Sequence, residues 1–189
     1  MQIDRILYPV ESLGPGNRLV IWTVGCSKHC PHCANKELWA WDDSRDIAVD
    51  ELFQMIKKNV DLEKVDGVTF TGGDPMEQMD DLLELLQMIR QHISDILVYT
   101  GYTWQEIVER EPLKSESIRK NVSVLIDGRY VDELNDRKCV LRGSTNQKIY
   151  YFDPTMQRKY EEYMEKGRKV QNIYSDSGVV SVGIHNKES

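Results

Sequence analysis

Two periodicities of hydrophobic positions alternate along the 189 residues. Short apolar runs rich in β-branched residues predict buried strands, and apolar residues three and four positions apart predict helices with one buried face. The predicted strands span residues 18–24, 66–71, 96–100, 122–126 and 148–152. The predicted helices span residues 46–60, 77–92, 103–111 and 153–166. This alternation indicates an α/β fold in which helices cover a mostly parallel sheet.

Local signals mark several helix boundaries. Thr103 and Glu106 have the spacing of a capping box, and Pro112 is expected to end the helix that they begin. Asp153, followed directly by proline, suits an N-cap and a first helical position. The tail at 172–184 alternates weakly around Ser177-Gly178, which predicts a hairpin.

Each chemically unusual segment follows a predicted strand. The cysteine-rich stretch GCSKHCPHC follows the first, and GGDP, GYT and DGRY follow the next three. Carboxyl ends of parallel strands meet at one edge of a sheet, where ligand sites gather. We therefore expect these four loops to converge on one rim.

Composition narrows the partners and the compartment. The formal net charge of −7 disfavours the nucleic-acid backbone and anionic membrane surfaces as partners. No apolar run approaches the ~18 residues of a membrane helix, and the first 14 residues lack the apolar core of a signal peptide. A cytoplasmic location is expected, and in that reducing compartment clustered cysteines favour metal binding or catalysis over structural disulfides.

Three cysteines fall within eight residues, at Cys26, Cys30 and Cys33. Cys30 and Cys33 resemble a thiol–disulfide motif. In that interpretation Cys26 has no role, and a reducing compartment disfavours disulfide chemistry. A zinc site needs a fourth ligand, for which His29 or His32 is available, although no second cysteine pair exists. A zinc-stabilised binding module without catalysis is thus an open alternative.

An iron–sulfur cluster is the third interpretation. A 4Fe–4S cluster held by three thiolates leaves one iron open to a cofactor or substrate, so three cysteines rather than four are explained. Cys139 lies far from the others in sequence and has the character of a small buried apolar residue.

The C-x3-C-x2-C spacing resembles the signature of the radical S-adenosylmethionine superfamily. Further segments resemble one family within it, the activating proteins of anaerobic ribonucleoside-triphosphate reductases, and they occur in that family's order over residues 8–150. These segments are YPV at 8–10, GPG at 14–16, the cysteine stretch at 25–36, GGDP at 72–75, TGY at 100–102, VLIDG at 124–128 and LRGSTNQ at 141–147.

The resemblance implies an incomplete parallel (β/α) barrel of the radical S-adenosylmethionine type. The chain length and the lack of a linker predict a single domain over residues 1–189. The resemblance divides it into a core at about 8–152 and a short C-terminal extension at 153–189. The extension passes beyond the compact family core. We expect it either to cover the barrel's open side or to select a partner.

The resemblance also implies an activity. Cys26, Cys30 and Cys33 would ligate a 4Fe–4S cluster whose open iron binds S-adenosylmethionine, and a small carrier such as flavodoxin or ferredoxin would supply the electron. A 5′-deoxyadenosyl radical would then take a hydrogen atom from a glycine of the partner, most simply an anaerobic ribonucleotide reductase. A radical enzyme acting on another glycyl-radical enzyme, a peptide or a small molecule is the nearest alternative.

Further residues are candidates for the cofactor and the partner. Paired glycines let a backbone approach a ligand closely, and Asp74 offers an acceptor for an ammonium group where many superfamily members carry Glu. GGDP and Asp127-Gly128 are also ordinary turn sequences. The cofactor candidates are His32, Cys33, Ala34, Gly72, Gly73, Asp74, Thr100 and Asp127, and the candidates for the partner or the cofactor carboxylate are Arg129, Arg142 and Asn146.

Overall fold

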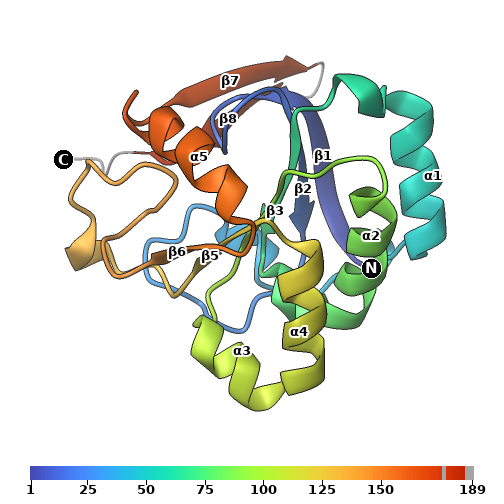
Figure 1. The fold of residues 1–189 in the computed structure, drawn as a ribbon, viewed down its shortest axis with the longest axis horizontal. Helices are drawn as coiled ribbons and strands as arrows, with labels where there is room; N and C mark the ends of the chain where they lie inside the picture. The colour runs from blue at the N-terminus through green and yellow to red at the C-terminus, as the bar shows by residue number, and fades with distance from the viewer. Residues whose placement is uncertain (176–177, 186–189) are drawn as a thin grey trace.

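A computed structural model describes residues 1–175 and 178–185. Its main feature is a six-stranded sheet in the order β1-β2-β3-β4-β5-β6 (Figure 1). The strands are β1 Ile3–Val10, β2 Arg18–Thr23, β3 Gly67–Gly72, β4 Ile96–Tyr99, β5 Val124–Asp127 and β6 Lys148–Tyr151. Strands β2 to β5 are parallel, and β1 and β6 pair antiparallel at the two edges. The predicted α/β fold with a mostly parallel sheet is confirmed.

One or two α-helices follow each of the parallel strands β2, β3 and β4, and another follows the edge strand β6. They are α1 Val49–Asn59, α2 Met79–Arg90, α3 Trp104–Arg110, α4 Pro112–Asn121 and α5 Gln157–Met164. Short 3-10 turns are η1 Lys36–Leu38, η2 Asp43–Arg45, η3 Leu62–Lys64, η4 Pro75–Gln78, η5 Asp132–Leu134 and η6 Pro154–Met156. A separate hairpin joins β7 Val170–Ser175 to β8 Gly178–Gly183, as predicted, although Ser177 lies outside the described residues.

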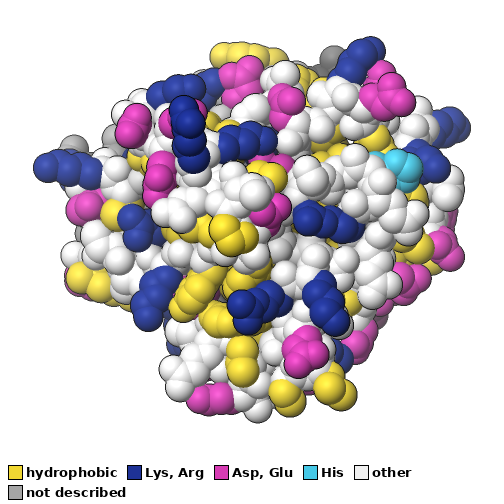
Figure 2. Space-filling model, viewed as in Figure 1, with side chains coloured by type: hydrophobic (Ala, Val, Ile, Leu, Met, Phe, Trp, Pro, Cys, Tyr) yellow, Lys and Arg dark blue, Asp and Glu magenta, His cyan; other side chains and the backbone are white. Residues whose placement is uncertain are grey.

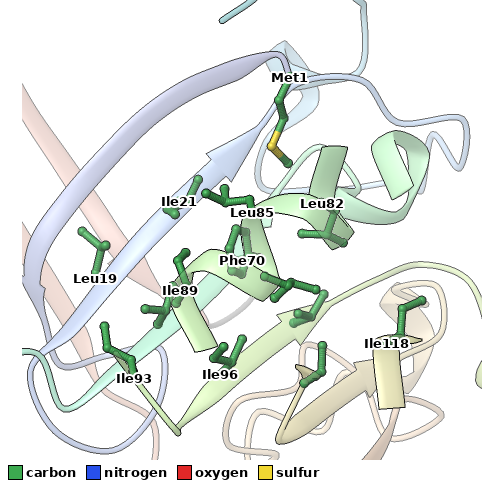
Figure 3. Packing of buried hydrophobic residues seen from close by; sticks show 14 of the residues in the cluster. Met1, Leu19, Ile21, Phe70, Leu82, Leu85, Ile89, Ile93, Ile96 and Ile118 are labelled. Carbon is green, nitrogen blue, oxygen red and sulfur yellow. The ribbon is translucent and has the colours of Figure 1, made fainter. Parts of the chain in front are cut away.

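Alternation along each strand assigns its side chains to the two faces of the sheet. Ile21 of β2 and Phe70 of β3 belong to the large apolar core, which also includes α1 and α2. Figure 3 shows these two side chains beside Leu85 and Ile89 of α2. Each fully buried side chain of this kind contributes about 1.5–3 kcal/mol by leaving water, so this face is held mainly by apolar burial.

The C-terminal extension covers the opposite face. Val182 of β8 packs with Val20 and Trp22 of β2, and Tyr160 of α5 packs with Leu97 of β4. The extension therefore forms a layer over this face of the sheet.

Buried charges tie this layer to the amino ends of the strands. Arg18 is fully buried, and its guanidinium donates to Asp95 Oδ1 at 3.1 Å and to Thr69 Oγ1 at 2.7 Å. From the extension, Lys159 Nζ and Tyr160 Oη donate to the two oxygens of Asp95, each at 2.7 Å. Because each charge is paired and hydrogen-bonded, the network is satisfied despite its burial.

One β-strand and one α-helix were not predicted. Strand β1 was missed because Asp4 and Arg5 interrupt its apolar positions, and its pairing with β2 shifts register twice. Helix α4 was missed because Pro112 was interpreted only as the end of the preceding helix. Pro112 is instead the first residue of α4. At that position the fixed φ of proline suits the helix, and the N–H that it lacks would have no partner within the helix.

Candidate functional site

The three cysteines lie on a closed loop at the carboxyl end of β2. The backbone N–H groups of Gly25 and Cys26 donate to the carbonyls of Leu38 and Trp39, at 2.9 and 3.0 Å, and so close the loop. Gly25 has a φ of +87°, a conformation that favours glycine. Cys26, Cys30 and Cys33 are free and half-buried.

Inside the loop, backbone amides turn toward the sulfurs. His29 and His32 adopt left-handed φ values of 46° and 59°, which coil the chain tightly between the cysteines. The N–H of Asn35 donates to Cys33 Sγ at 3.4 Å. Amides that face sulfur atoms are one of the means by which proteins adjust cluster potentials.

Burial raises the pKa of the Cys26 and Cys30 thiols above the ordinary value. Hydrogen bonds from the backbone of Lys28 to Cys26 and of Tyr130 to Cys30 act in the opposite direction. Without a metal these thiols are therefore protonated near neutral pH. Metal binding must release those protons, which makes assembly of a centre pH-dependent.

The GGDP segment packs directly against the start of this loop. The N–H of Gly73 donates to the carbonyl of Thr23, and that of Asp74 to the carbonyl of Gly25, both at 2.8 Å. A Cβ at Gly73 would lie 2.4 Å from the Gly25 oxygen, so only glycine permits this approach. The glycine thus has a structural use that is independent of any ligand.

Asp74 is buried at the rim, with a side chain that is 1 % exposed. Its Oδ1 accepts from the N–H of Met76 at 3.0 Å, and its Oδ2 accepts from the N–H of Gly101 at 2.8 Å and from Thr100 Oγ1 at 3.2 Å. Burial raises the pKa of Asp74 to about 6, although these donors act against the rise. This carboxylate is satisfied by neutral donors and faces no cation in the described chain.

Glu77 is a site residue that sequence reasoning missed. Its Oε1 accepts from the N–H of Ser27 at 3.0 Å, from the Ser27 hydroxyl and from Tyr102 Oη at 3.2 Å. The Lys28 ammonium lies 3.0 Å from the centre of the Tyr102 ring. Glu77 therefore ties the cysteine loop to η4 and to the loop after β4. No sequence signal distinguishes it from an ordinary exposed glutamate.

Asp127 ends β5 as predicted, but its carboxylate is engaged by backbone. Its Oδ2 accepts from the N–H of Trp104 at 2.6 Å and its Oδ1 from the N–H of Lys148 at 3.2 Å. It thereby stabilises the first turn of α3, beside the Thr103–Glu106 capping box that the structure confirms.

The candidate basic and amide residues lie on the loops after β5. Arg142 Nη1 donates to the carbonyl of Gln147 at 3.0 Å, and Asn146 Nδ2 to the carbonyl of Arg129 at 2.8 Å. The Arg129 guanidinium is close enough to Cys30 to favour its thiolate. Of these three candidates, Arg129 is therefore the one whose charge reaches the cysteine loop.

A hollow of about 800 Å³ opens beside the cysteine loop, and we call it the cysteine-side hollow. Its volume is within the range of small-molecule sites. His32, Cys33 and Ala34 line it, which brings three of the predicted cofactor residues together. Its wall also includes Tyr99, the end of β8 with the two residues after it, and residues from the loops between β5 and β6. None of these lining residues was among the predicted site residues.

The other predicted residues do not line this hollow. In the part of the chain that the structure describes, Gly72, Gly73, Asp74, Thr100, Asp127, Arg129, Arg142 and Asn146 lie outside its lining. Three of them support the cysteine loop: Gly73 packs against the Gly25 carbonyl, the N–H of Asp74 donates to it, and Thr100 donates to Asp74 Oδ2. Gly72 pairs with Thr23 at the end of β2. The predicted site residues therefore fall into two groups, those that line the cysteine-side hollow and those outside its lining, some of which hold the cysteine loop in place.

Charges on the face viewed in Figure 2 are mixed, with basic and acidic side chains interspersed rather than gathered. Within residues 1–175 and 178–185, no helix has the length and apolar character needed to cross a membrane. In the same residues, no group of three His, Cys, Asp or Glu side chains is arranged to hold a single metal ion.

Comparison with known proteins assigns the family. Residues 12–150 match the family model of a 4Fe-4S single cluster domain. The anaerobic ribonucleoside-triphosphate reductase-activating protein of Escherichia coli is 33% identical over 150 residues, covering 76% of this chain and 95% of the relative. Its counterpart in Pasteurella multocida is 32% identical over 157 residues, covering 77% and 94%. The chain therefore belongs to the family of anaerobic ribonucleoside-triphosphate reductase-activating proteins.

Among solved structures, the chain is similar to QueE from Escherichia coli, with a TM-score of 0.46 and 18% identity. The match covers 54% of this chain and 53% of QueE.

The loop fits an iron–sulfur cluster by its donor chemistry. Three thiols on one closed loop are the ligands that such clusters use, and amide N–H groups approach the sulfurs. A cluster is larger than one ion and each cysteine binds a different iron, so the thiols need not converge on one point.

Proposed function

We propose that this protein installs a glycyl radical on an anaerobic ribonucleoside-triphosphate reductase, using a 4Fe–4S cluster and S-adenosylmethionine. The observation that carries the proposal is the closed three-cysteine loop at the carboxyl end of β2, in a chain of the reductase-activating family. We regard the open sheet as an incomplete barrel of the radical S-adenosylmethionine type. We treat residues 1–189 as one domain, with a core at 8–152 and an extension at 153–189.

Cys26, Cys30 and Cys33 are the residues that hold the cluster in this proposal. When bound, the cluster and S-adenosylmethionine together supply the one-electron chemistry that removes a hydrogen atom from a glycine. The loop contributes amides that face the sulfurs and, through Glu77, a fixed position relative to the rim. Three thiols leave one coordination position for the cofactor.

We propose the same cofactor-binding residues as the sequence predicts, and two observations support them. His32, Cys33 and Ala34 line the cysteine-side hollow, which supports a place for the adenine there. The remaining cofactor candidates at the rim are Gly72, Gly73, Asp74, Thr100 and Asp127. Gly73 and Asp74 contact the Gly25 carbonyl, and Asp74 accepts from Thr100 and Gly101 of the loop after β4.

For docking the partner or holding the cofactor carboxylate, the candidates are Arg129, Arg142 and Asn146. Arg129 is the strongest, because its charge already favours the Cys30 thiolate and its side chain is exposed. Arg142 and Asn146 fix the loops that carry it, through their bonds to Gln147 and to Arg129 itself.

The partners follow from the reaction. The proposed substrate protein is the reductase, and a small carrier such as flavodoxin or ferredoxin is proposed as the electron donor. We place the protein in the cytoplasm, because free thiols and a reducible cluster require a reducing compartment.

Metal analysis of protein purified without oxygen tests the proposal. We expect about four irons and four sulfides per chain, with a brown colour that Cys30→Ala removes. Cys139→Ala is the matched control, because this thiol lies outside the loop, and it should keep the iron. The reduced protein should cleave S-adenosylmethionine, and a glycyl-radical signal should appear by electron paramagnetic resonance when the reductase is added.

One zinc per chain in a colourless protein would overturn the radical mechanism and leave a zinc-stabilised binding module. Cofactor cleavage without a glycyl radical on the reductase would instead assign the chemistry to another glycyl-radical enzyme, a peptide or a small molecule.

A further inference from the structure

The hairpin β7–β8 lies beyond residue 150, where the match to the family model ends. Side chains of β8 alternate as in a half-buried strand. Val182 is 2 % exposed and packs with Trp22, as do Val180 and Ile184, whereas Val179 is 57 % exposed. The hairpin therefore lies with one face on the sheet.

One edge of the hairpin borders open space beside the site. Consecutive residues from Val180 to His185 line a second hollow of about 180 Å³, which also touches Ala34, Asn35 and Tyr99. Alternate residues of a strand point to opposite faces, so an unbroken run of lining residues places the edge of β8, not only a face, against this space.

Along residues 179–184 that edge is unpaired in the described chain. β8 pairs only with β7 in a two-stranded sheet, and among the described residues no backbone hydrogen bond joins 179–184 to a segment other than β7. Natural sheet edges are blunted by lysine, by proline or by inward charges. The sequence VVSVGI at 179–184 contains none of these and is rich in β-branched residues.

The edge leads to the proposed cluster site. Gly183, Ile184 and His185 line the cysteine-side hollow as well as the second one, and so does the segment after Cys33. An extended chain lying along β8 would therefore run from the solvent side of the hairpin to the cysteine loop.

The chemistry of the substrate suits such an edge. A glycine has no side chain, so an enzyme that acts on it within a protein must recognise the backbone around it. Strand addition does this, since backbone hydrogen bonds supply affinity and neighbouring pockets take the flanking side chains. We propose that the free edge of β8 binds the glycine-bearing segment of the reductase as an added strand.

This inference rests on the proposed function and adds the place and manner of substrate binding. It also gives the C-terminal extension a second use besides covering the sheet. A second copy of this chain is the competing occupant, because two such edges can pair with each other.

Hydrogen exchange on the cluster-loaded protein tests the proposal directly. The probe is a synthetic peptide of about 15 residues centred on the radical-bearing glycine of the reductase from the same genome, a span long enough to pair with a strand of ordinary length. We expect slower exchange at the amides of residues 179–184 and no change in α4. Unchanged exchange in β8 would overturn the proposal, and so would a concentration-dependent dimer that protects β8 without peptide.

A matched pair of variants measures the contribution of the edge. Ser181→Pro removes one amide of β8, whereas Ser181→Ala keeps it and removes only an exposed hydroxyl. For whole reductase we expect Ser181→Pro to raise the KM about tenfold with little change in kcat, from the loss of one or two backbone hydrogen bonds. Equal KM values for the two variants would contradict strand addition.

Cleavage of S-adenosylmethionine in the absence of reductase separates the two levels of failure. If cleavage and the glycyl radical are present while β8 stays unprotected, only the strand-addition proposal fails. If neither is present in the wild type, the proposed function fails first. A thermal melt of Ser181→Pro within a few degrees of wild type shows that the hairpin layer is intact.

Discussion

Two buried aspartates at opposite ends of the sheet have opposite surroundings. Asp95 lies at the amino end of β4 and is 2 % exposed. Its carboxylate accepts hydrogen bonds from Arg18, Lys159 and Tyr160. Asp74 lies at the carboxyl rim and is 1 % exposed. In the described chain its carboxylate accepts hydrogen bonds only from backbone N–H groups and from the Thr100 hydroxyl. The pKa of Asp95 is lowered, chiefly by the coulombic effect of Arg18 against the cost of burial, whereas burial raises that of Asp74 to about 6.

The different surroundings of the two aspartates indicate different roles, stability for Asp95 and support of the functional site for Asp74. At the amino end, opposite charges meet and anchor the C-terminal layer to the sheet. At the rim, the Asp74 carboxylate, which has no opposite charge as a partner, joins the loop after β3 to the loop after β4, at a cost in free energy when it ionises. The backbone N–H of the same residue donates to Gly25 of the cysteine loop. Such perturbed groups cluster at functional sites, and the carboxyl whose pKa burial raises lies beside the cysteine loop.

Removing the carboxylate at the amino end should have the largest effect. Asp95→Ala leaves Arg18 buried without its charge partner, which costs about 3–5 kcal/mol of the free energy of unfolding. Urea unfolding of wild type and variant measures it. Lys159→Met is the matched control, because Lys159 is 41 % exposed at its side chain and its ion pair is expected to contribute at most about 1 kcal/mol.

Equal losses in the two variants would contradict this account, since the burial of Arg18 would then not decide the energetics. A loss below about 1 kcal/mol for Asp95→Ala would show that water reaches the network, because screened surface pairs have values of that size.

The pH dependence of stability should have opposite signs at the two ends. Between the ordinary pKa of ~3.9 and about 6, folded Asp74 keeps a proton that the unfolded chain has lost. Stability therefore falls as pH rises through this interval, by roughly 3 kcal/mol at 1.36 kcal/mol per pKa unit. Asp95, with its lowered pKa, loses its contribution only as pH falls below the ordinary value.

The test compares the free energies of unfolding of wild type and Asp74→Asn from pH 4 to 7. Their difference gives the contribution of the Asp74 carboxyl to the pH dependence of stability. Asparagine has the same shape and does not titrate, so the difference should decline with rising pH. A flat difference would mean that Asp74 is ionised at little cost and would remove the contrast with Asp95.

Thr100→Val should have the smallest effect and should sharpen the contrast. Valine matches the shape of threonine, removes a donor to Asp74 Oδ2 and leaves the N–H of Tyr102 without its acceptor. We expect a loss of about 1 kcal/mol for the broken bonds and a further rise in the pKa of Asp74. The pH midpoint of the wild-type-minus-asparagine curve, measured again in the Thr100→Val background, should move upward; an unchanged midpoint would contradict this role for Thr100.

Much of the framework was predictable from local pattern. The strands with continuous apolar runs and the amphipathic helices were found because burial imposes their periods on the sequence. Thr103 and Glu106 were assigned correctly because a capping box is a contact within four residues. The family was recognisable from Cys26, Cys30 and Cys33 together with GGDP and RGSTNQ, a prediction that the comparisons confirm.

The residues that sequence reasoning missed act over long separations. Arg18 meets Asp95 across 77 positions, and Glu77 meets Ser27 across 50. Each is a charged residue next to a turn, where a solvated side chain is the ordinary expectation. Nothing local distinguishes the buried partner from the exposed one.

The sequence by itself determined most of the helices and strands, the position of the three cysteines and the family, because these depend on neighbours and on residue type. Only the tertiary structure decided how the rim is built. It placed Gly73 against the carbonyl of Gly25, engaged both oxygens of Asp74, and set the open edge of β8 beside the cysteine loop. These contacts join segments that are distant in the chain, so they arise from packing and hydrogen-bond satisfaction across the whole fold.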